Sequence, residues 1–367
     1  MNLLIIMPDL YHGGAETQMR NLACEMRKRG HDVTLLLSSL HGTRAKSQEQ
    51  EEFERRFANR IVRLNGPKVN GWFTRQLRRR ELCSLAVSTI LKRQIDACLV
   101  YDFVALHVAP QLSRYTRVVF SERNEGNYSR FALVRNRRFF RSLNAVTCNS
   151  TIAQDNYSKH GIEATLIENG VQAERYPLSE RSDFYRVLIP ARVCPMKNQR
   201  VVFEADGVLP PSLKVEYRFA GTVEDEDYYG ALLDLSRNIR PTSKVEFLGF
   251  VSNMSVEYKT CDAVILPSLS EGTPNVVLES IFHGRPVLAS AIPQNENILD
   301  AAWQFNPGSA RDLATKLIRL AGAHREHVCQ IVDQNASRLS GRYTVEKMAH
   351  EFETLFLQVI GENSESK

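Results

Sequence analysis

The stretch that most restricts the fold of this chain is residues 262–290, which read DAVILPSLSEGTPNVVLESIFHGRPVLAS. It opens with a short apolar run, AVIL, and closes with a second, PVLA, and such runs are typical of buried parallel strands. Between the two runs, Thr273 is a good helix N-cap, Pro274 suits the first helical position and Gly284 predicts the helix end. The pattern predicts a βαβ unit, in which ligands bind at the carboxyl ends of the strands, against helix N-termini.

Two carboxylates belong to this predicted ligand-binding edge. Glu271 lies in the loop before the N-cap, and Glu279 is expected about two turns into the helix. The helix rise places Glu279 about 9 Å beyond Thr273, so the two carboxylates would bracket a ligand of disaccharide or nucleotide size. Free N–H groups of the first helical turn favour an anion in the same space. The alternative interpretation is a solvated loop glutamate and an unrelated glutamate on a helix face.

The rest of the chain repeats the same alternation of short apolar strands and helices. At the amino end, a strand at 3–7 is followed by Gly13-Gly14, a helix over 15–29 and a strand at 33–37. A glycine pair directly before a helix lets the backbone approach a ligand closely. Further strands are expected at 97–100, 117–120, 145–148, 164–167, 187–190, 215–220 and 245–250. A length of 367 residues predicts two domains, each large enough for its own core.

Several motifs in this order resemble one enzyme family. EGTPNVVLE after a strand that ends in PS resembles the E-x7-E signature of retaining glycosyltransferases of family 4. PDLYHGGAE, the NGV turn at 169–171 and the R-x4-K spacing in ARVCPMKN are similar to further motifs of that family. The resemblance implies the α/β GT-B fold, in which two Rossmann-like domains with parallel sheets face each other across a cleft. It implies an acceptor-side domain at 1–180, a nucleotide-sugar domain at 181–340 and a tail at 341–367 whose helix returns to the first domain.

The resemblance also implies roles for residues of the second domain. The first glutamate of the signature, Glu271, would contact the hydroxyls of the donor sugar, and Glu279 would hold the nucleotide's ribose. Arg192 and Lys197 would neutralise the donor diphosphate, where charge develops as the glycosidic bond breaks. Catalytic roles therefore fall to Glu271, Arg192 and Lys197.

Other residues are expected to bind substrate without taking part in catalysis. Gly13 and Gly14 correspond to a glycine pair that faces the donor phosphates and the acceptor. Many family members have a histidine where this chain has Ser121-Glu122-Arg123-Asn124, a sequence that resembles a subset acting on lipid-linked sugars. The expected substrate-binding residues are Gly13, Gly14, Glu122, Arg123, Gly249, Phe250, Thr273, Pro274, Asn275, Val276 and Glu279.

The expected activity is retaining transfer of a hexose or N-acetylhexosamine from a nucleotide-sugar donor, most often a UDP-sugar. The expected acceptor is a glycan, in particular a lipid-linked one of surface polysaccharide, lipopolysaccharide or glycoconjugate synthesis. Two alternatives remain: a nucleotide-sugar epimerase of the same fold, and a non-catalytic membrane-bound partner of another transferase. We expect no cofactor and no metal, because the D-x-D pattern at 225–227 falls in an acidic stretch that reads as a surface loop.

The charge is concentrated in the first domain. Residues 55–141 hold 19 Lys and Arg against 5 Asp and Glu, although the net charge of the whole chain is only +5. Arg78, Arg79 and Arg80 lie in one basic-aromatic segment, over 72–93, and a second such segment covers 128–141. They are either core-packed helices with solvated basic faces or a patch that binds an anionic membrane or a diphosphate-linked lipid. Nucleic acid is disfavoured because no recognised reading module accompanies the charge.

The cysteines and the hydropathy pattern suggest a compartment. The 7 cysteines are dispersed without a C-x-x-C pair, which is typical of reduced thiols in a cytosolic protein. No apolar run approaches the roughly 18 residues of a membrane span, and the amino end reads as a strand and not as a signal peptide. We therefore expect a cytoplasmic protein, attached peripherally to the inner face of the cell membrane. The tail over 343–360 is expected to be an amphipathic helix.

Overall fold

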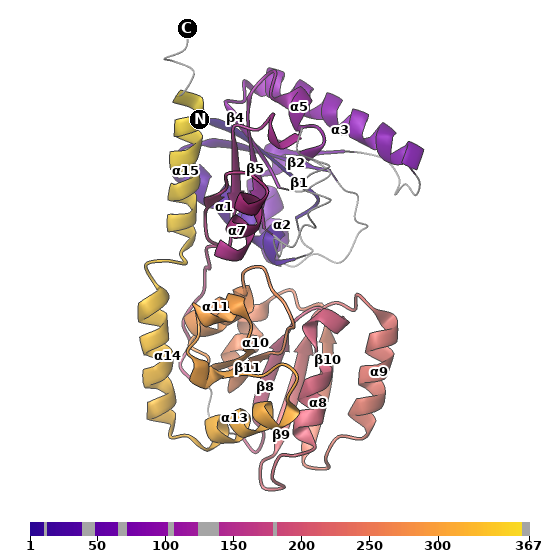
Figure 1. The fold of residues 1–367 in the computed structure, drawn as a ribbon, viewed down its shortest axis with the longest axis vertical. Helices are drawn as coiled ribbons and strands as arrows, with labels where there is room; N and C mark the ends of the chain where they lie inside the picture. The colour runs from indigo at the N-terminus through magenta and orange to yellow at the C-terminus, as the bar shows by residue number, and fades with distance from the viewer. Residues whose placement is uncertain are drawn as a thin grey trace. The chain divides into compact units, whose positions relative to one another are not determined.

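The computed structural model describes residues 1–10, 13–38, 48–64, 72–101, 106–123, 139–178 and 182–361, with the backbone alone at 48–50 and 72–75. The chain forms two compact units (Figure 1). Unit 1 comprises residues 1–170 and 343–367, and unit 2 comprises residues 171–342. Gly170 lies at the boundary, where a Cβ would come within 2.5 Å of the Cα of Val345. Only a residue without a side chain permits this approach of two backbone segments.

Unit 1 is built on a parallel sheet with strand order β3-β2-β1-β4-β5-β6-β7. The central strands are buried on both faces, as expected for a parallel sheet covered on both sides. Its strands are β1 (Asn2–Met7), β2 (Asp32–Leu37), β3 (Ile61–Arg63), β4 (Ala97–Val100), β5 (Arg117–Glu122), β6 (Ala145–Cys148) and β7 (Thr165–Leu166). Of these, β3 has no counterpart among the predicted strands.

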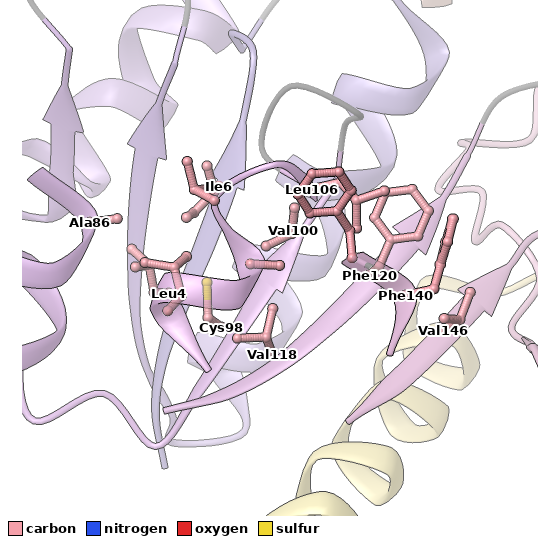
Figure 2. Close-up of a cluster of buried hydrophobic side chains, with 14 of the residues drawn as sticks. Leu4, Ile6, Ala86, Cys98, Val100, Leu106, Val118, Phe120, Phe140 and Val146 are labelled. Carbon is pink, nitrogen blue, oxygen red and sulfur yellow. The ribbon is translucent and has the colours of Figure 1, made fainter. Parts of the chain in front are cut away.

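Helices cover both faces of this sheet. One face carries α3 (Trp72–Arg93), α5 (Ala109–Leu112) and α7 (Thr151–Lys159), whose side chains join the cluster in Figure 2. The other carries α1 (Gly14–Lys28) and the tail helix α15 (Val345–Gly361), which pack side by side. The predicted apolar face of the tail is confirmed: Met348, Phe352, Leu355, Phe356 and Val359 are all buried. The short helix α2 (Gln48–Arg56) and the 3-10 turn η1 (Ala58–Arg60) precede β3.

Unit 2 repeats the plan with the strand order β10-β9-β8-β11-β12-β13. Its strands, again parallel, are β8 (Tyr185–Pro190), β9 (Val215–Ala220), β10 (Ser243–Gly249), β11 (Ala263–Leu266), β12 (Val287–Ser290) and β13 (Gln304–Phe305). Its helices are α8 (Arg200–Asp206), α9 (Glu226–Arg237), α10 (Met254–Thr260), α11 (Asn275–Phe282), α12 (Pro293–Glu296), α13 (Ala310–Gly322) and α14 (Arg325–Leu339), with 3-10 turns η2 (Pro195–Lys197) and η3 (Ala301–Trp303). The predicted βαβ unit over 262–290 is confirmed as β11-α11-β12.

Two predicted helix details in unit 2 were wrong. Thr273 does not cap α11, which begins at Asn275 after Pro274 at the cap position, so Glu279 lies one residue nearer the helix start than predicted. The D-x-D segment is not a surface loop. Asp225 is the N-cap of α9, and its side chain accepts a hydrogen bond of 2.8 Å from the backbone N–H of Tyr228. A carboxylate at this position stabilises the helix start, which explains the acidic pattern without a metal.

The basic-aromatic segments of unit 1 are only partly described, because 128–138 and the side chains of Trp72 and Phe73 lie outside the described residues. Phe139 and Phe140, in the second of these segments, are buried in the core, as the core-packed alternative predicts, and Figure 2 shows Phe140 beside Phe120. On α3, the apolar side chains of Leu77 and Leu91 are exposed. Among the described residues, no helix is both long enough and apolar enough to cross a membrane.

Candidate functional site

The candidate site of unit 2 forms where the loops after β8 and β11 meet. The two strands are neighbours in the sheet, so their carboxyl-end loops lie together, and the N–H of Leu269 donates to the carbonyl of Met196 at 2.9 Å. This contact brings Lys197 to Glu271, with 2.7 Å between Nζ and Oε1. Both side chains are largely enclosed, at 12% and 13% exposed. The ammonium has three donors and the carboxylate about four acceptor positions, so each retains capacity for a ligand after pairing.

Arg192 has a different carboxylate partner. Its Nη1 lies 2.7 Å from Oε2 of Glu224, and about half of each side chain is exposed. The buried amide of Gln199 donates to the carbonyl of Arg192 at 2.8 Å, which holds the backbone of the loop in place. The two predicted cations of the R-x4-K motif therefore come from the same loop, but each is paired with its own acid.

A glycine lets the loop after β9 approach the Arg192 loop. A Cβ on Gly221 would lie 2.0 Å from the carbonyl oxygen of Ala191, so no side chain fits there. The N–H of Gly221 donates to the carbonyl of Gly249 at 2.8 Å, which ties the ends of β9 and β10 together. Gly249 has a φ of +63, a left-handed conformation that favours glycine, and the adjacent Phe250 is 44% exposed. Phe250 thus offers an aromatic face beside the same edge of the sheet.

Glu279 is supported by residues that the sequence did not indicate. The hydroxyl of Tyr258 in α10 donates to its Oε2 at 2.9 Å, and the Tyr258 ring stacks on His283 with 4.6 Å between centroids. Burial raises the pKa of Glu279 to about 7, although the hydrogen bond from Tyr258 acts in the opposite direction. Tyr258 precedes Glu279 by 21 residues on a separate helix. No spacing rule connects the two, so only the tertiary structure reveals the pair.

The start of α11 offers fewer free N–H groups than expected. The N–H of Asn275 donates to the carbonyl of Thr273 at 2.8 Å, and that of Val277 donates to Pro274 at 2.9 Å. These bonds form a tight turn because the helix starts after the proline. Thr273, Asn275 and Val276 are each partly buried near the start of α11, beside the loop that carries Glu271.

In unit 1, the glycine pair opens α1 as predicted. Gly13 is the N-cap in an extended conformation, and its carbonyl accepts from the N–H of Thr17 at 3.2 Å. Both Gly13 and Gly14 are exposed, and no side chain caps the helix. The pair lies just past the carboxyl end of β1, the edge at which ligands of parallel sheets bind.

Glu122 and Arg123, which were expected to bind substrate, are enclosed in unit 1. Glu122 is 1% exposed and accepts from the hydroxyl of Tyr157 at 3.3 Å. Arg123 is 4% exposed, donates to the carbonyl of Ile167 at 2.8 Å, and stacks on the Phe352 ring at 5.0 Å. Burial lowers the pKa of Arg123 to about 10. Both side chains bind groups of their own unit in this structure, and their direct contact with substrate stays a prediction.

Comparisons with known proteins identify the class. Solved structures align over the whole chain, with low sequence identity. HepE of Anabaena in complex with UDP-glucose is 19% identical, has a TM-score of 0.74, and the match covers 100% of both chains. Sucrose-phosphate synthase of Thermosynechococcus elongatus is 16% identical, with a TM-score of 0.79 over 98% of this chain and 99% of that one. TarM of S. aureus, solved as a variant with Fondaparinux, alpha-GlcNAc-glycerol and UDP, is 11% identical, with a TM-score of 0.73 over 97% of this chain and 99% of that one.

Two Rossmann-like units, each built on a parallel sheet, define the GT-B fold. The family profile "Glycosyltransferase Family 4" matches residues 12–175, and "Glycosyl transferases group 1" matches residues 185–322. The chain therefore belongs to the group 1, family 4 glycosyltransferases and is an enzyme of that family. No curated protein sequence matches it.

Proposed function

We propose that this enzyme transfers a hexose or N-acetylhexosamine, with retention, from a UDP-sugar to a glycan acceptor. The observation that carries the proposal is the enclosed Lys197–Glu271 pair at the carboxyl edge of the unit 2 sheet, within 2.7 Å. Family membership supplies the reaction class. UDP as the activating group is supported by the solved relatives HepE and TarM, whose structures contain UDP or UDP-glucose.

The proposed donor site uses the described geometry of unit 2. Lys197 and Arg192 would neutralise the diphosphate, and Glu271 would orient the sugar through its hydroxyls. Glu279, held by Tyr258, would accept hydrogen bonds from the ribose. Gly249 and Phe250 would border the base, and the residues from Thr273 to Val276 would line the space between the two glutamates.

The chemistry follows from the charge that develops on the leaving group. As the glycosidic bond breaks, the diphosphate gains negative charge, and a preorganised cation beside it lowers the barrier. We propose front-face attack, in which the leaving phosphate oxygen takes the proton of the acceptor hydroxyl. Glu271 then positions the sugar and forms no covalent intermediate. No step needs a metal, so transfer should continue in excess EDTA.

On the acceptor side, we propose that Gly13 and Gly14 border the acceptor, and that the acceptor is lipid-linked. Glu122 and Arg123 take a positioning role in this proposal, because Glu122 accepts from Tyr157 of α7, and Arg123 donates to the carbonyl of Ile167 and lies over the Phe352 ring of α15. The basic character of residues 55–141 supports a peripheral position on an anionic membrane, where a lipid-linked acceptor would be found.

The test has two stages. Thermal shift against a panel of nucleotides and nucleotide-sugars should single out UDP and one UDP-sugar, since a ligand at 100 times its Kd stabilises by about 2.7 kcal/mol. The selected donor, radiolabelled in its sugar, is then incubated with and without a lipid-linked glycan. Label should move to the lipid fraction only when the acceptor is present. A free or altered sugar formed from donor alone would instead indicate an epimerase, and stabilisation only by purine nucleotides would refute the UDP assignment.

A further inference from the structure

A charged cavity lies in unit 1, away from the residues assigned to donor and acceptor. It has a volume of about 450 Å3 and is lined by five arginines with Ala58 and Asn59. The arginines come from the ends of three helices and from η1: Arg27, Arg55, Arg56, Arg60 and Arg93. No acidic residue is among the described residues that line it. The volume is within the range of roughly 300–1,000 Å3 typical of ligand pockets.

The cavity lies at the amino ends of the strands. Arg27 is in the last turn of α1 before β2, Arg60 directly precedes β3, and Arg93 ends α3 shortly before β4. Gly13 follows β1, at the opposite edge of the same parallel sheet. The arginine cavity is therefore separate from the edge at which the family binds its substrates.

Part of the cluster is held in place by the backbone of the turn at 56–60. Arg27 donates from Nη1 to the carbonyl of Arg56 at 2.7 Å, and its guanidinium lies 4.7 Å from the centroid of the Phe57 ring. Arg93 donates from Nη2 to the carbonyl of Asn59 at 2.8 Å. Each of these bonds uses one of a guanidinium's five N–H donors. The two side chains are thus preorganised and keep donors for a ligand.

The remaining arginines are less engaged. Arg60 pairs with Asp32, with 2.8 Å between Nη2 and Oδ2. Arg55 and Arg56 are exposed, and among the described residues their guanidiniums form no hydrogen bond or ion pair. An anion could therefore bind these two guanidiniums without displacing a hydrogen bond or ion pair within the described part of the chain.

Helix ends account for some of the positive charge but not for all of it. The C-termini of α1, α2 and α3 meet here, and basic residues stabilise such ends because each carries about −0.5 charge. Three helix ends and Asp32 together supply about −2.5 against five guanidiniums, which leaves about +2.5 unbalanced. An excess of this size, presented by forked donors, matches a phosphate-bearing anion, which arginine binds in bidentate geometry.

We propose that this cavity binds phosphate groups, either of a soluble phosphate compound or of a lipid headgroup. The inference does not depend on the donor assignment, because the cavity lies in unit 1 and none of its residues belongs to the proposed donor site of unit 2.

The experiment compares two charge-matched double variants of the full chain. Arg55→Gln/Arg56→Gln changes the cavity, and Arg311→Gln/Arg319→Gln removes the same charge from exposed positions of α13 in unit 2, outside it. Binding of inorganic pyrophosphate is measured by calorimetry, and binding to phosphatidylglycerol vesicles by co-sedimentation, both at about 0.1 M salt. Arg55 and Arg56 make no side-chain hydrogen bond among the described residues, so the cavity variant should keep the melting temperature of wild type.

We expect the cavity variant to bind at least one of the two probes about tenfold more weakly than wild type, while the α13 variant changes less than twofold. A loss confined to pyrophosphate assigns the site to soluble phosphate compounds, and a loss confined to vesicles assigns it to lipid headgroups. Equal weakening in both variants would mean a general charge effect and would overturn the proposal. So would the absence of any binding, or pyrophosphate binding that Lys197→Ala abolishes and Arg55→Gln/Arg56→Gln leaves intact.

Discussion

At the scale of single residues, the charged groups of the proposed donor site are paired before any ligand arrives. Lys197 is bound to Glu271 and Arg192 to Glu224. The first pair is enclosed, so its electrostatic interaction is stronger than that of the second, which solvent screens. A diphosphate would therefore meet one preorganised cation, Lys197, and one that must exchange a surface partner, Arg192. This difference predicts that Lys197 contributes more to turnover than Arg192.

Lys197→Ala should lower kcat by about 100- to 1,000-fold, the cost of removing one preorganised group that stabilises developing charge. Glu271→Gln should also lower kcat, and the double variant should lose less than the product of the two effects, because the residues act on each other within 2.7 Å. Steady-state kinetics on the three variants measure this, with Arg237→Ala on exposed α9 as control. Strictly multiplicative effects would argue against a functional pair.

The carboxyl of Glu279 should make stability depend on pH. Its pKa is raised from 4.5 to about 7 in the folded protein, so between these values the folded state binds more protons than the unfolded state. Stability must then fall as pH rises through this window, by up to about 3 kcal/mol for this one group. Glu279→Gln lacks the contribution, so its free energy of unfolding should increase relative to wild type between pH 5 and pH 8. Urea unfolding of both proteins at the two pH values measures these free energies. A difference between variant and wild type that is the same at pH 5 and pH 8 would refute the raised pKa.

At the scale of elements, the residues at the ends of helix α11 determine where the side chain of Glu279 lies. The start of α11 is set by Pro274, and Gly284, with a φ of +81, ends the segment before β12. A Cβ on Gly284 would lie 2.6 Å from the carbonyl oxygen of Tyr176, so this glycine is needed both for its conformation and for space. These constraints fix where Glu279 projects from α11, because each residue of a helix is displaced by a constant rise and rotation.

The helix α9 allows a direct test of the D-x-D segment. Asp225→Ala should reduce the free energy of unfolding by about 1 kcal/mol, because it removes the N-cap hydrogen bond to Tyr228. Asp225→Asn should be nearly neutral, since asparagine is an equally good cap. Transfer activity per folded molecule should be the same in both. A loss of activity in Asp225→Asn that manganese restores would return the segment to a metal-binding role.

At the scale of the whole molecule, the two ends of the chain belong to one unit. Helix α15 packs on α1, and its buried apolar side chains join the core formed by residues near the amino end. Unit 1 therefore depends on residues that follow the complete sequence of unit 2. Its stability should respond strongly to changes near the carboxyl end.

Phe352→Ala should destabilise unit 1 by about 3–5 kcal/mol, because the ring is fully buried and also contacts the Arg123 guanidinium. Leu357→Ala on the same helix is the control: this side chain is 56% exposed, and its loss should cost less than about 0.5 kcal/mol. Denaturant unfolding followed by far-UV circular dichroism reports both. Equal costs would mean that α15 does not pack as described.

Local patterns predicted most of the strands and helices and the resemblance to the family, although β3 was missed. Strand runs such as AVIL, the glycine before α1 and the E-x7-E spacing act over a few residues, where steric preference and hydrogen bonding are set by neighbours in the chain. The helix α11 was predicted one residue too early at its start, because Pro274 and not Thr273 takes the cap position.

Contacts between segments that are distant in the sequence determined which side chains pair with one another and which are buried. Lys197 and Glu271 are 74 residues apart and meet because β8 and β11 are neighbours in the sheet. Arg123, which the resemblance of Ser121-Glu122-Arg123-Asn124 assigned to substrate binding, is buried, and Ser121, Ile167 and Asn169 accept hydrogen bonds from its Nε and Nη1 inside unit 1. The five arginines of the cavity lie in three separate helices and a turn, and only the packing of those elements places them around one space. Charge and polarity are properties of the sequence, whereas partner and burial depend on the strand order, which brings distant residues to the same edge of a sheet.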